Sequence, residues 1–144
     1  MVSIFHKLGI ETIFNNDTIT IKKTATPIES NLILDLNDAP DIAQTIAVCC
    51  FGLGISCHLT GLQTLKIKET DRLIALKTEL TKLGATIEVT EDSLTLKSST
   101  NIYSNVSIST YQDHRMAMAF APLSIKVPIV IEEAEVVSKS YPAF

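Results

Sequence analysis

The chain has 144 residues, 46% of them hydrophobic, and a formal net charge of -4. This is enough apolar material for one domain of ordinary size without disulfides, and the negative charge argues against duplex nucleic acid or an anionic membrane as the main partner. No apolar run reaches the roughly 18 residues that a membrane span needs. The cysteines Cys49 and Cys50 are adjacent inside an apolar run, which indicates reduced thiols and a cytoplasmic protein.

The first half of the chain is predicted to contain a helix end, a hairpin, and a buried helix between two strands. The hairpin strands alternate apolar and polar side chains around the turn 15–17. Pro40 is placed to open the helix, which is apolar on nearly every face and is therefore expected to be buried. These elements are expected at residues 3–8, 11–14, 18–22, 32–36, 42–53 and 57–59.

The second half begins with five charges in the seven residues 66–72, directly before a leucine pattern at helical spacing. These charges therefore lie at a helix N-terminus, which Thr70 is expected to cap. A hairpin, a strand, a second buried helix that Pro122 ends or kinks, and a last strand follow. The expected ranges are 73–83, 86–89, 93–97, 106–109, 116–123 and 128–131.

The chain also repeats itself. Lys7-Leu8-Gly9 recurs 75 residues later as Lys82-Leu83-Gly84, and the hairpins that follow agree at the same offset. This predicts a duplicated unit, with copies at about 1–75 and 76–144, in an α/β (α+β) array of repeated β-α-β units with mixed strand order. The chain starts inside a helix pattern and stops without a cap, so we expect one partial domain of a longer protein.

Each of the two predicted buried helices, and the leucine helix, begins with charged or ionisable side chains. If the units pack in parallel, these starts meet on one surface, where helix dipoles and cations favour a multiply charged anion. Glu69 could move a proton there, and Lys139, near the chain end, could join. The residues concerned are Asp41, Lys68, Glu69, Arg72, Asp113, His114 and Arg115.

Simpler interpretations stay open at this point. Asp41 and Asp113 could be first-turn capping acids, and residues 66–72 a solvated helix entrance with internal salt bridges. His114 could be an ordinary boundary histidine. We expect no metal site, because His58 beside Cys57 has no second Cys/His pair at ligand spacing.

Four blocks of sequence together resemble the 5-enolpyruvylshikimate-3-phosphate synthase (3-phosphoshikimate 1-carboxyvinyltransferase) family. The blocks Lys68-Glu69-Thr70-Asp71-Arg72 and Tyr111-Gln112-Asp113-His114-Arg115 are specific. Pro40-Asp41 and Lys139-Ser140-Tyr141-Pro142 agree in order and spacing. The resemblance covers nearly the whole chain and implies the C-terminal portion of a two-domain fold, an inside-out α/β barrel of mixed sheets around buried parallel helices.

The resemblance also implies an activity. The family transfers the enolpyruvyl group of phosphoenolpyruvate to the 5-hydroxyl of shikimate 3-phosphate and releases phosphate, without metal or organic cofactor, on the route to chorismate and aromatic amino acids. It further implies that the residues binding the shikimate phosphate lie in the other, N-terminal domain of the same protein. We therefore expect this chain alone to be inactive.

Roles follow from the same resemblance, position by position. Asp41 resembles the proton acceptor for the 5-hydroxyl, with Lys68 near that hydroxyl, and Glu69 resembles the acid that protonates the methylene carbon. Arg72, Arg115 and Lys139 match the cations that bind phosphoenolpyruvate in the family, and His114 matches a neighbouring histidine that orients the site. Thr64 stands where many relatives have an asparagine, so that contact is not transferred.

Two other functions remain as alternatives. One is the related enolpyruvyl transferase that acts on UDP-N-acetylglucosamine, which shares the fold but differs in the two specific blocks. The other is a non-catalytic domain that binds anions or a protein partner.

Overall fold

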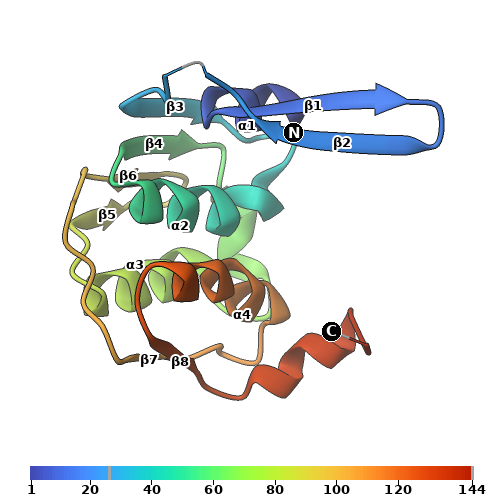
Figure 1. Ribbon diagram of the computed structural model, residues 1–144. Coiled ribbons are helices and arrows are strands. Elements are labelled where there is room, and N and C mark those ends of the chain that lie inside the picture. Colours follow the sequence, from blue (N-terminus) through green and yellow to red (C-terminus); the bar gives the residue numbers. More distant parts are fainter. Residues whose placement is uncertain (26, 144) are drawn as a thin grey trace.

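The computed structural model describes residues 1–25 and 27–143. Its elements follow the predicted order, with short 3-10 turns between them (Figure 1). The helices are α1 (Val2–Lys7), α2 (Ala43–Leu53), α3 (Arg72–Lys82) and α4 (His114–Phe120). The strands are β1 (Ile10–Asn15), β2 (Thr18–Lys23), β3 (Asn31–Asp35), β4 (Ser56–Thr60), β5 (Ile87–Val89), β6 (Leu94–Leu96), β7 (Val106–Ile108) and β8 (Ile129–Ile131).

The strands of the described residues form three open sheets, none of which closes into a barrel. β1 and β2 make an antiparallel hairpin, and β7 and β8 a parallel pair. The largest sheet has the order β3-β4-β6-β5, in which β3 and β4 are parallel while β6 runs antiparallel to both of its neighbours. This confirms the predicted α/β class with a mixed sheet.

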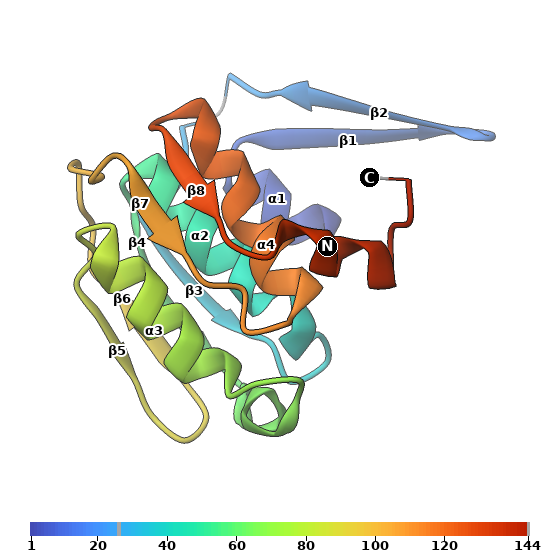
Figure 2. The ribbon, with the colours of Figure 1, turned by 90° about the horizontal axis from the view of Figure 1, so that it is seen from below.

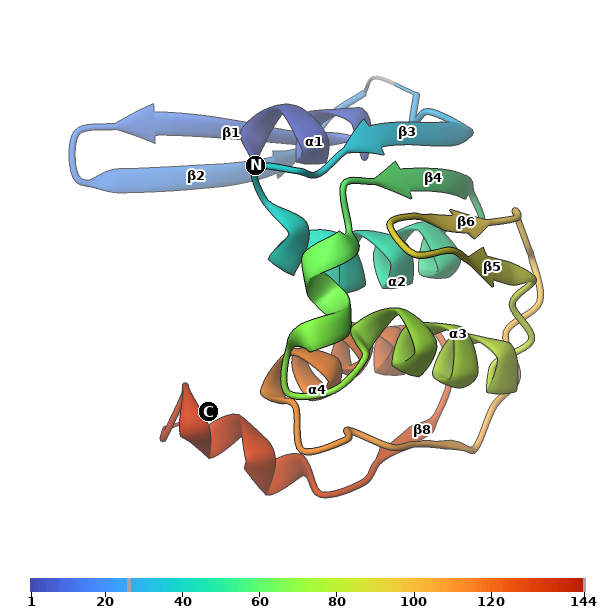
Figure 3. The same ribbon diagram turned by 180° about the vertical axis from the view of Figure 1, so that it is seen from behind.

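Helix α2 lies between this sheet and the two helices α3 and α4 (Figures 1 and 3). It is buried because its apolar residues surround the axis, and side chains such as Ile46 and Phe51 are almost inaccessible to solvent. α4 lies beside it (Figure 2). Its side chains Met116 and Phe120 are buried. Both predictions of a buried helix are therefore confirmed.

The two buried helices run in the same direction. At their starts, the Arg115 guanidinium donates to the main-chain oxygen of Asp41 at 3.3 Å. At their far ends, Gly52 of α2 lies so near Leu123 that an added Cβ would stand only 3.0 Å from that side chain. α4 ends at Phe120, and a 3-10 turn, Ala121–Ile125, continues the chain with Pro122 in its first turn, so the proline does end the helix.

Helix α3 covers the other side of α2 with an amphipathic face. Leu73, Leu76 and Leu80 are buried, as their spacing predicts. The cap at its start differs from the prediction, because Asp71 rather than Thr70 accepts hydrogen bonds from the amides of residues 73 and 74. The carboxylate lies one residue closer to these amides and is also the better match for the positive end of the helix dipole.

The two halves have the same order of helices and strands, which supports the predicted duplication without testing it. Their hairpins differ in environment. In β6, Leu94 and Leu96 are 0% and 1% exposed, whereas Ile19 and Ile21 at the matching places of β2 are 62% and 68% exposed. β6 pairs with β4, while β2 pairs among the described residues with β1 alone, so the same alternating pattern stays solvent-accessible. No helix among the described residues is both long and apolar enough to cross a membrane.

Candidate functional site

The starts of α2, α3 and α4 meet around one buried side chain, Arg72. Arg72 is 1% exposed, and its guanidinium donates to three carboxylates that come from three separate segments. Nε lies 2.6 Å from Asp113, Nη1 2.9 Å from Asp41 and Nη2 2.7 Å from Glu69. The convergence predicted from the sequence is therefore observed for these four residues.

Local structure places the innermost pair, Arg72 and Asp113. Arg72 is the first residue of α3, and Asp113 is the N-cap of α4, where it accepts the Arg115 amide at 2.8 Å. Asp113 is fully buried, so its charge is stabilised by the guanidinium and by this amide rather than by water. The pair fixes the distance between the starts of two helices that lie 41 residues apart in the chain.

Asp41 lies in the 3-10 turn Pro40–Ile42 that leads into α2, and two further cations face it. Lys68 Nζ is 3.3 Å and Arg115 Nη2 3.6 Å from its carboxylate. Burial raises the pKa of Asp41, but the hydrogen bond from Lys68 and the charges of Arg115, Lys68 and Arg72 together lower it below its ordinary value. Asp41 is therefore ionised at neutral pH and can accept a proton.

Glu69 lies at the outer edge of the cluster, with 44% of its side chain exposed. A hydrogen bond from its own backbone amide is the main cause that lowers its pKa, and the charges of Arg72, His114 and Lys68 add to it against a smaller effect of burial. Without a ligand, Glu69 is therefore a carboxylate rather than an acid. His114 is partly buried, and one of its ring nitrogens lies within 4.8 Å of a carboxylate oxygen of Glu69.

Lys139 approaches the cluster only through the neighbouring loop. Its Nζ donates to the main-chain oxygen of Gln112 at 3.1 Å, one residue before Asp113. Two surface hollows flank the buried guanidinium. One is lined by Asp41, Thr45, His114, Arg115, Met118, Ser140 and Tyr141, and the other by Glu69, Thr70, Ser109, Thr110, Tyr111, Gln112, Glu132 and Glu133.

The structure brings together one set of possible metal ligands that the sequence did not predict. Ligand atoms of Glu69, Asp113 and His114 lie within 4.8 Å of one another. Both carboxylates already bind Arg72, and its positive charge opposes a cation at the same place. The place beside Arg72 therefore suits an anion that replaces one of these carboxylates better than it suits a metal ion.

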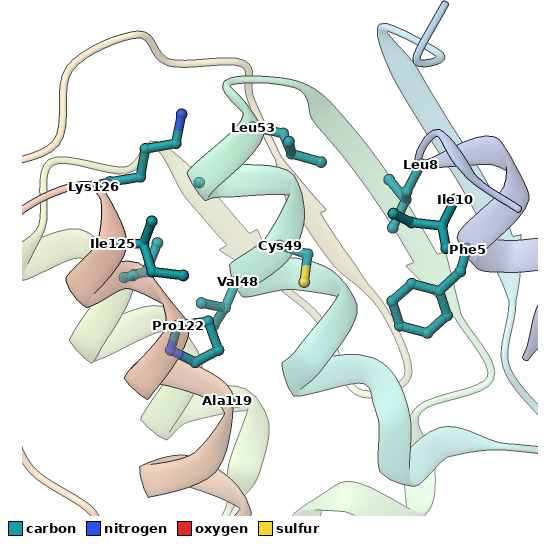
Figure 4. Close-up of a pocket in the computed structure, with 12 residues that line it drawn as sticks. Phe5, Leu8, Ile10, Val48, Cys49, Leu53, Ala119, Pro122, Ile125 and Lys126 are labelled. Atoms are coloured by element: carbon teal, nitrogen blue, oxygen red, sulfur yellow. The ribbon is translucent and has the colours of Figure 1, made fainter. Parts of the chain in front are cut away.

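Other features of the charged and apolar sequence lie away from the cluster. Lys66 pairs with Glu91 on the surface, and the His58 ring bonds the Thr95 hydroxyl across β4 and β6. An apolar pocket lies between α1, α2 and the segment after α4, lined by residues such as Phe5, Val48 and Pro122 (Figure 4). Lys126 is the one charged residue among the described residues that line the pocket, and a single cation is not enough to bind a multiply charged acid.

Sequence reasoning placed Asp113 among the charged helix starts but did not identify it as the buried partner of Arg72. It missed two further residues near the site. Glu79 is 0% exposed and accepts the Tyr111 hydroxyl at 2.6 Å. A signal for Glu79 was present, because it stands seven residues after Arg72 on the leucine face of α3, where an acid is unexpected. Gln44 is buried near the start of α2, and its amide has no hydrogen-bond partner among the described residues.

Fold and cluster together define an α/β protein whose helix starts gather three cations and three carboxylates, an arrangement suited to binding a small, multiply charged acid and moving a proton. The chain matches the family EPSP synthase (3-phosphoshikimate 1-carboxyvinyltransferase) over residues 1–144. It therefore belongs to the EPSP synthase family.

Individual relatives agree with this assignment. The chain is 46% identical to a 3-phosphoshikimate 1-carboxyvinyltransferase of Bacteroides fragilis, covering 98% of this chain and 35% of that protein. It is 37% identical to one of Clostridium novyi, covering 100% and 33%. An EPSP synthase structure from Acinetobacter baumannii superposes with a TM-score of 0.76 at 22% identity, covering 98% and 36%, which supports the fold. The chain thus spans about a third of the length of these relatives.

Proposed function

We propose that this chain forms part of a transferase that moves the enolpyruvyl group of phosphoenolpyruvate to the 5-hydroxyl of shikimate 3-phosphate and releases phosphate. The observation that carries the proposal is the cluster around Arg72, in a chain that belongs to the EPSP synthase family. The chain would supply the C-terminal portion, as one partial domain with units about 1–75 and 76–144, and the shikimate phosphate would be bound by the N-terminal portion.

In this proposal, the cations hold phosphoenolpyruvate. Arg115 is partly exposed and lines the hollow at Asp41. Lys139 binds the loop that precedes Arg115, through the main-chain oxygen of Gln112, so both cations are accessible to a ligand. Arg72 is different, because its donors already bind three carboxylates. We propose that the ligand's carboxylate or phosphate exchanges with Asp41 or Glu69 on Arg72, since planar guanidinium groups bind such anions in bidentate fashion.

The same exchange would prepare the proton transfers. Glu69 needs a proton before it can protonate the methylene carbon, although its own backbone amide and, to a smaller extent, the contact with Arg72 lower its pKa. Losing that contact and gaining a nearby anion both raise the pKa of a carboxyl group. Asp41 stays ionised through Lys68 and Arg115 and would accept the proton of the 5-hydroxyl, with Lys68 beside it. His114 would orient the site next to Glu69.

A cytoplasmic location is part of the proposal. The described residues include the free thiols of Cys49, Cys50 and Cys57. Burial raises the pKa of the Cys49 thiol, and the hydrogen bond with Cys57 raises that of Cys50, so these groups are poor thiolate nucleophiles. Such thiols suit a reducing compartment.

The test is turnover by a hybrid in which residues 1–144 replace the segment they match in the Bacteroides fragilis relative, which is 46% identical. The hybrid should release phosphate from phosphoenolpyruvate with shikimate 3-phosphate and not with UDP-N-acetylglucosamine. Glu69→Gln should abolish release while leaving the fold intact, and Glu91→Gln on the surface should not. Normal turnover by Glu69→Gln, or the opposite acceptor preference, would refute the proposal.

A further inference from the structure

The loop 109–113 delivers the residues of the site, and its backbone is unusual. Tyr111 and Gln112 both have φ of 55°, in the left-handed region that side chains other than glycine seldom adopt. Two such residues in succession persist only where surrounding contacts hold them. Asp113, His114 and Arg115 follow directly, so the path of this loop decides where they lie.

Helix α3 holds the loop at both ends. Arg72, in its first turn, binds the carboxylate of Asp113. Two turns further along the same helix, Glu79 accepts the Tyr111 hydroxyl on Oε1 at 2.6 Å and the Ser109 amide on Oε2 at 3.2 Å. Lys82, in the last turn, neutralises Glu79 from 2.7 Å.

The buried carboxylate is therefore engaged through both of its oxygens. Glu79 is 0% exposed, and a charge so far from water is held only where it is paired and hydrogen-bonded. Three of the groups that satisfy it are the Tyr111 hydroxyl, the Ser109 amide and the Lys82 ammonium group. The contacts with Tyr111 and Ser109 lie on the loop side, which indicates that the acid serves the loop rather than the stability of α3 itself.

We propose that Glu79 is a positioning residue: through Tyr111 and Ser109 it fixes the loop 109–113, and so it sets the places of Arg115 and Lys139 at the phosphoenolpyruvate site. The part of this inference that concerns phosphoenolpyruvate rests on the proposed function. Arg115 follows the loop in sequence, and its amide is bound by Asp113. Lys139 donates to the oxygen of Gln112, one of the two left-handed residues.

Two substitutions separate this role from simple folding. Tyr111→Phe keeps the ring and removes the hydroxyl that Glu79 accepts. Glu79→Gln leaves one acceptor oxygen for three donors, the Tyr111 hydroxyl, the Ser109 amide and the Lys82 ammonium group, so the contact with Tyr111 or Ser109 is weakened or lost. Tyr103→Phe is the matched control, because Tyr103 is 61% exposed and its hydroxyl has no hydrogen bond among the described residues.

Amide hydrogen exchange of the 144-residue chain tests the positioning independently of activity. The Asp113 and Arg115 amides, which donate to Thr110 and Asp113, should exchange about tenfold faster in Tyr111→Phe, while the amides of the β3–β4 pair stay unchanged. Glu79→Gln should act in the same way and Tyr103→Phe should not. Unaltered exchange at Asp113 and Arg115, or an equal rise throughout the chain, would overturn the inference.

Kinetics of the hybrid then connect the loop to the ligand. Both substitutions should raise KM for phosphoenolpyruvate about fivefold or more, with KM for shikimate 3-phosphate changed less than twofold. The double variant should be no worse than the poorer single one, because both changes break the same link. Equal rises in the two KM values, or multiplied effects, would overturn the inference. A hybrid inactive without substitutions would refute the proposed function instead, and hydrogen exchange would still decide the positioning.

Discussion

Truncating Asp113 probes the buried ion pair at the centre of the site. Asp113→Ala removes the cap of α4, worth about 1 kcal/mol, and leaves the 1%-exposed Arg72 without its nearest carboxylate. Removing one partner of a buried ion pair typically costs about 3–5 kcal/mol. We take the lower end, about 3 kcal/mol, because Asp41 and Glu69 still bind Arg72 after the substitution. We therefore expect the free energy of unfolding to fall by about 4 kcal/mol.

The matched control is Asp71→Ala. Asp71 caps α3 in the same way, through the amides of residues 73 and 74, but it binds no buried cation among the described residues, so only about 1 kcal/mol should be lost. Urea unfolding followed by far-ultraviolet circular dichroism measures both, with an unchanged m-value as the condition for comparison. Asp113→Asn keeps an acceptor at the cap and should fall between them. Equal losses for the two alanine variants would refute the idea that the Arg72–Asp113 pair holds the helix starts together.

Three further expectations follow from particular side chains. Leu94→Ala should lower the free energy of unfolding by about 2–5 kcal/mol, because the side chain is 0% exposed. Ile19→Ala, at the matching place of the first hairpin, should lower it by less than about 0.5 kcal/mol, because Ile19 is 62% exposed. Urea midpoints check both values, and equal effects would contradict the exposure of β2. Burial and the hydrogen bond to Glu79 raise the pKa of Tyr111 to about 12. The contribution of the Tyr111 hydroxyl to stability is therefore complete below the ordinary value of 10.0 and is lost as the pH rises through about 12. Near-ultraviolet absorbance should show one tyrosine that ionises near this pH, and Tyr111→Phe should remove that step. The pKa values of Asp41 and Glu69 are lowered, so the contribution of these carboxylates to stability is complete above their ordinary values of 3.8 and 4.5 and is lost as the pH falls through the lower folded values. Unfolding at neutral and acid pH should show less acid sensitivity in Glu69→Gln, and an unchanged profile would contradict the lowered pKa of Glu69.

Much of the fold follows from local pattern. The leucine spacing after Arg72 and the all-round apolar segment after Asp41 predict α3 and the buried α2, because burial of a helix face depends on spacing along the chain. Small differences at the ends have local causes. Thr70 and Asp71 can both cap a helix, and only the three-dimensional path shows that Asp71 reaches the free amides. The 3-10 turn Gln63–Ile67 before the charged segment carries no strong periodicity and was not predicted.

Pattern does not determine environment in the same way. The strands around residues 15–17 and 90–92 alternate alike, yet Leu94 is buried and Ile19 is exposed. The difference arises because β6 joins β4, a pairing between distant parts of the chain that alternation alone does not encode.

The candidate site, too, is predictable from the sequence only in part. Charged residues at helix starts are visible in the sequence, and the family resemblance assigns them roles. Their exact partners are not visible, because Arg72 meets Asp41 and Asp113 across 31 and 41 residues. The support from Glu79 is hidden for the same reason, since its contact with Tyr111 spans 32 residues. Sequence thus predicts which residues gather, and the structure shows which of them remain available to a ligand.

The most direct test of the central claim is a crystal structure of the hybrid with phosphoenolpyruvate bound. The ligand should lie between the starts of α2, α3 and α4, with its anionic groups within hydrogen-bond distance of Arg115 and with one carboxylate, of Asp41 or Glu69, displaced from Arg72. Phosphoenolpyruvate bound elsewhere, with all three carboxylates still on Arg72, would contradict the claim that these helix starts form one pocket for a small phosphorylated acid.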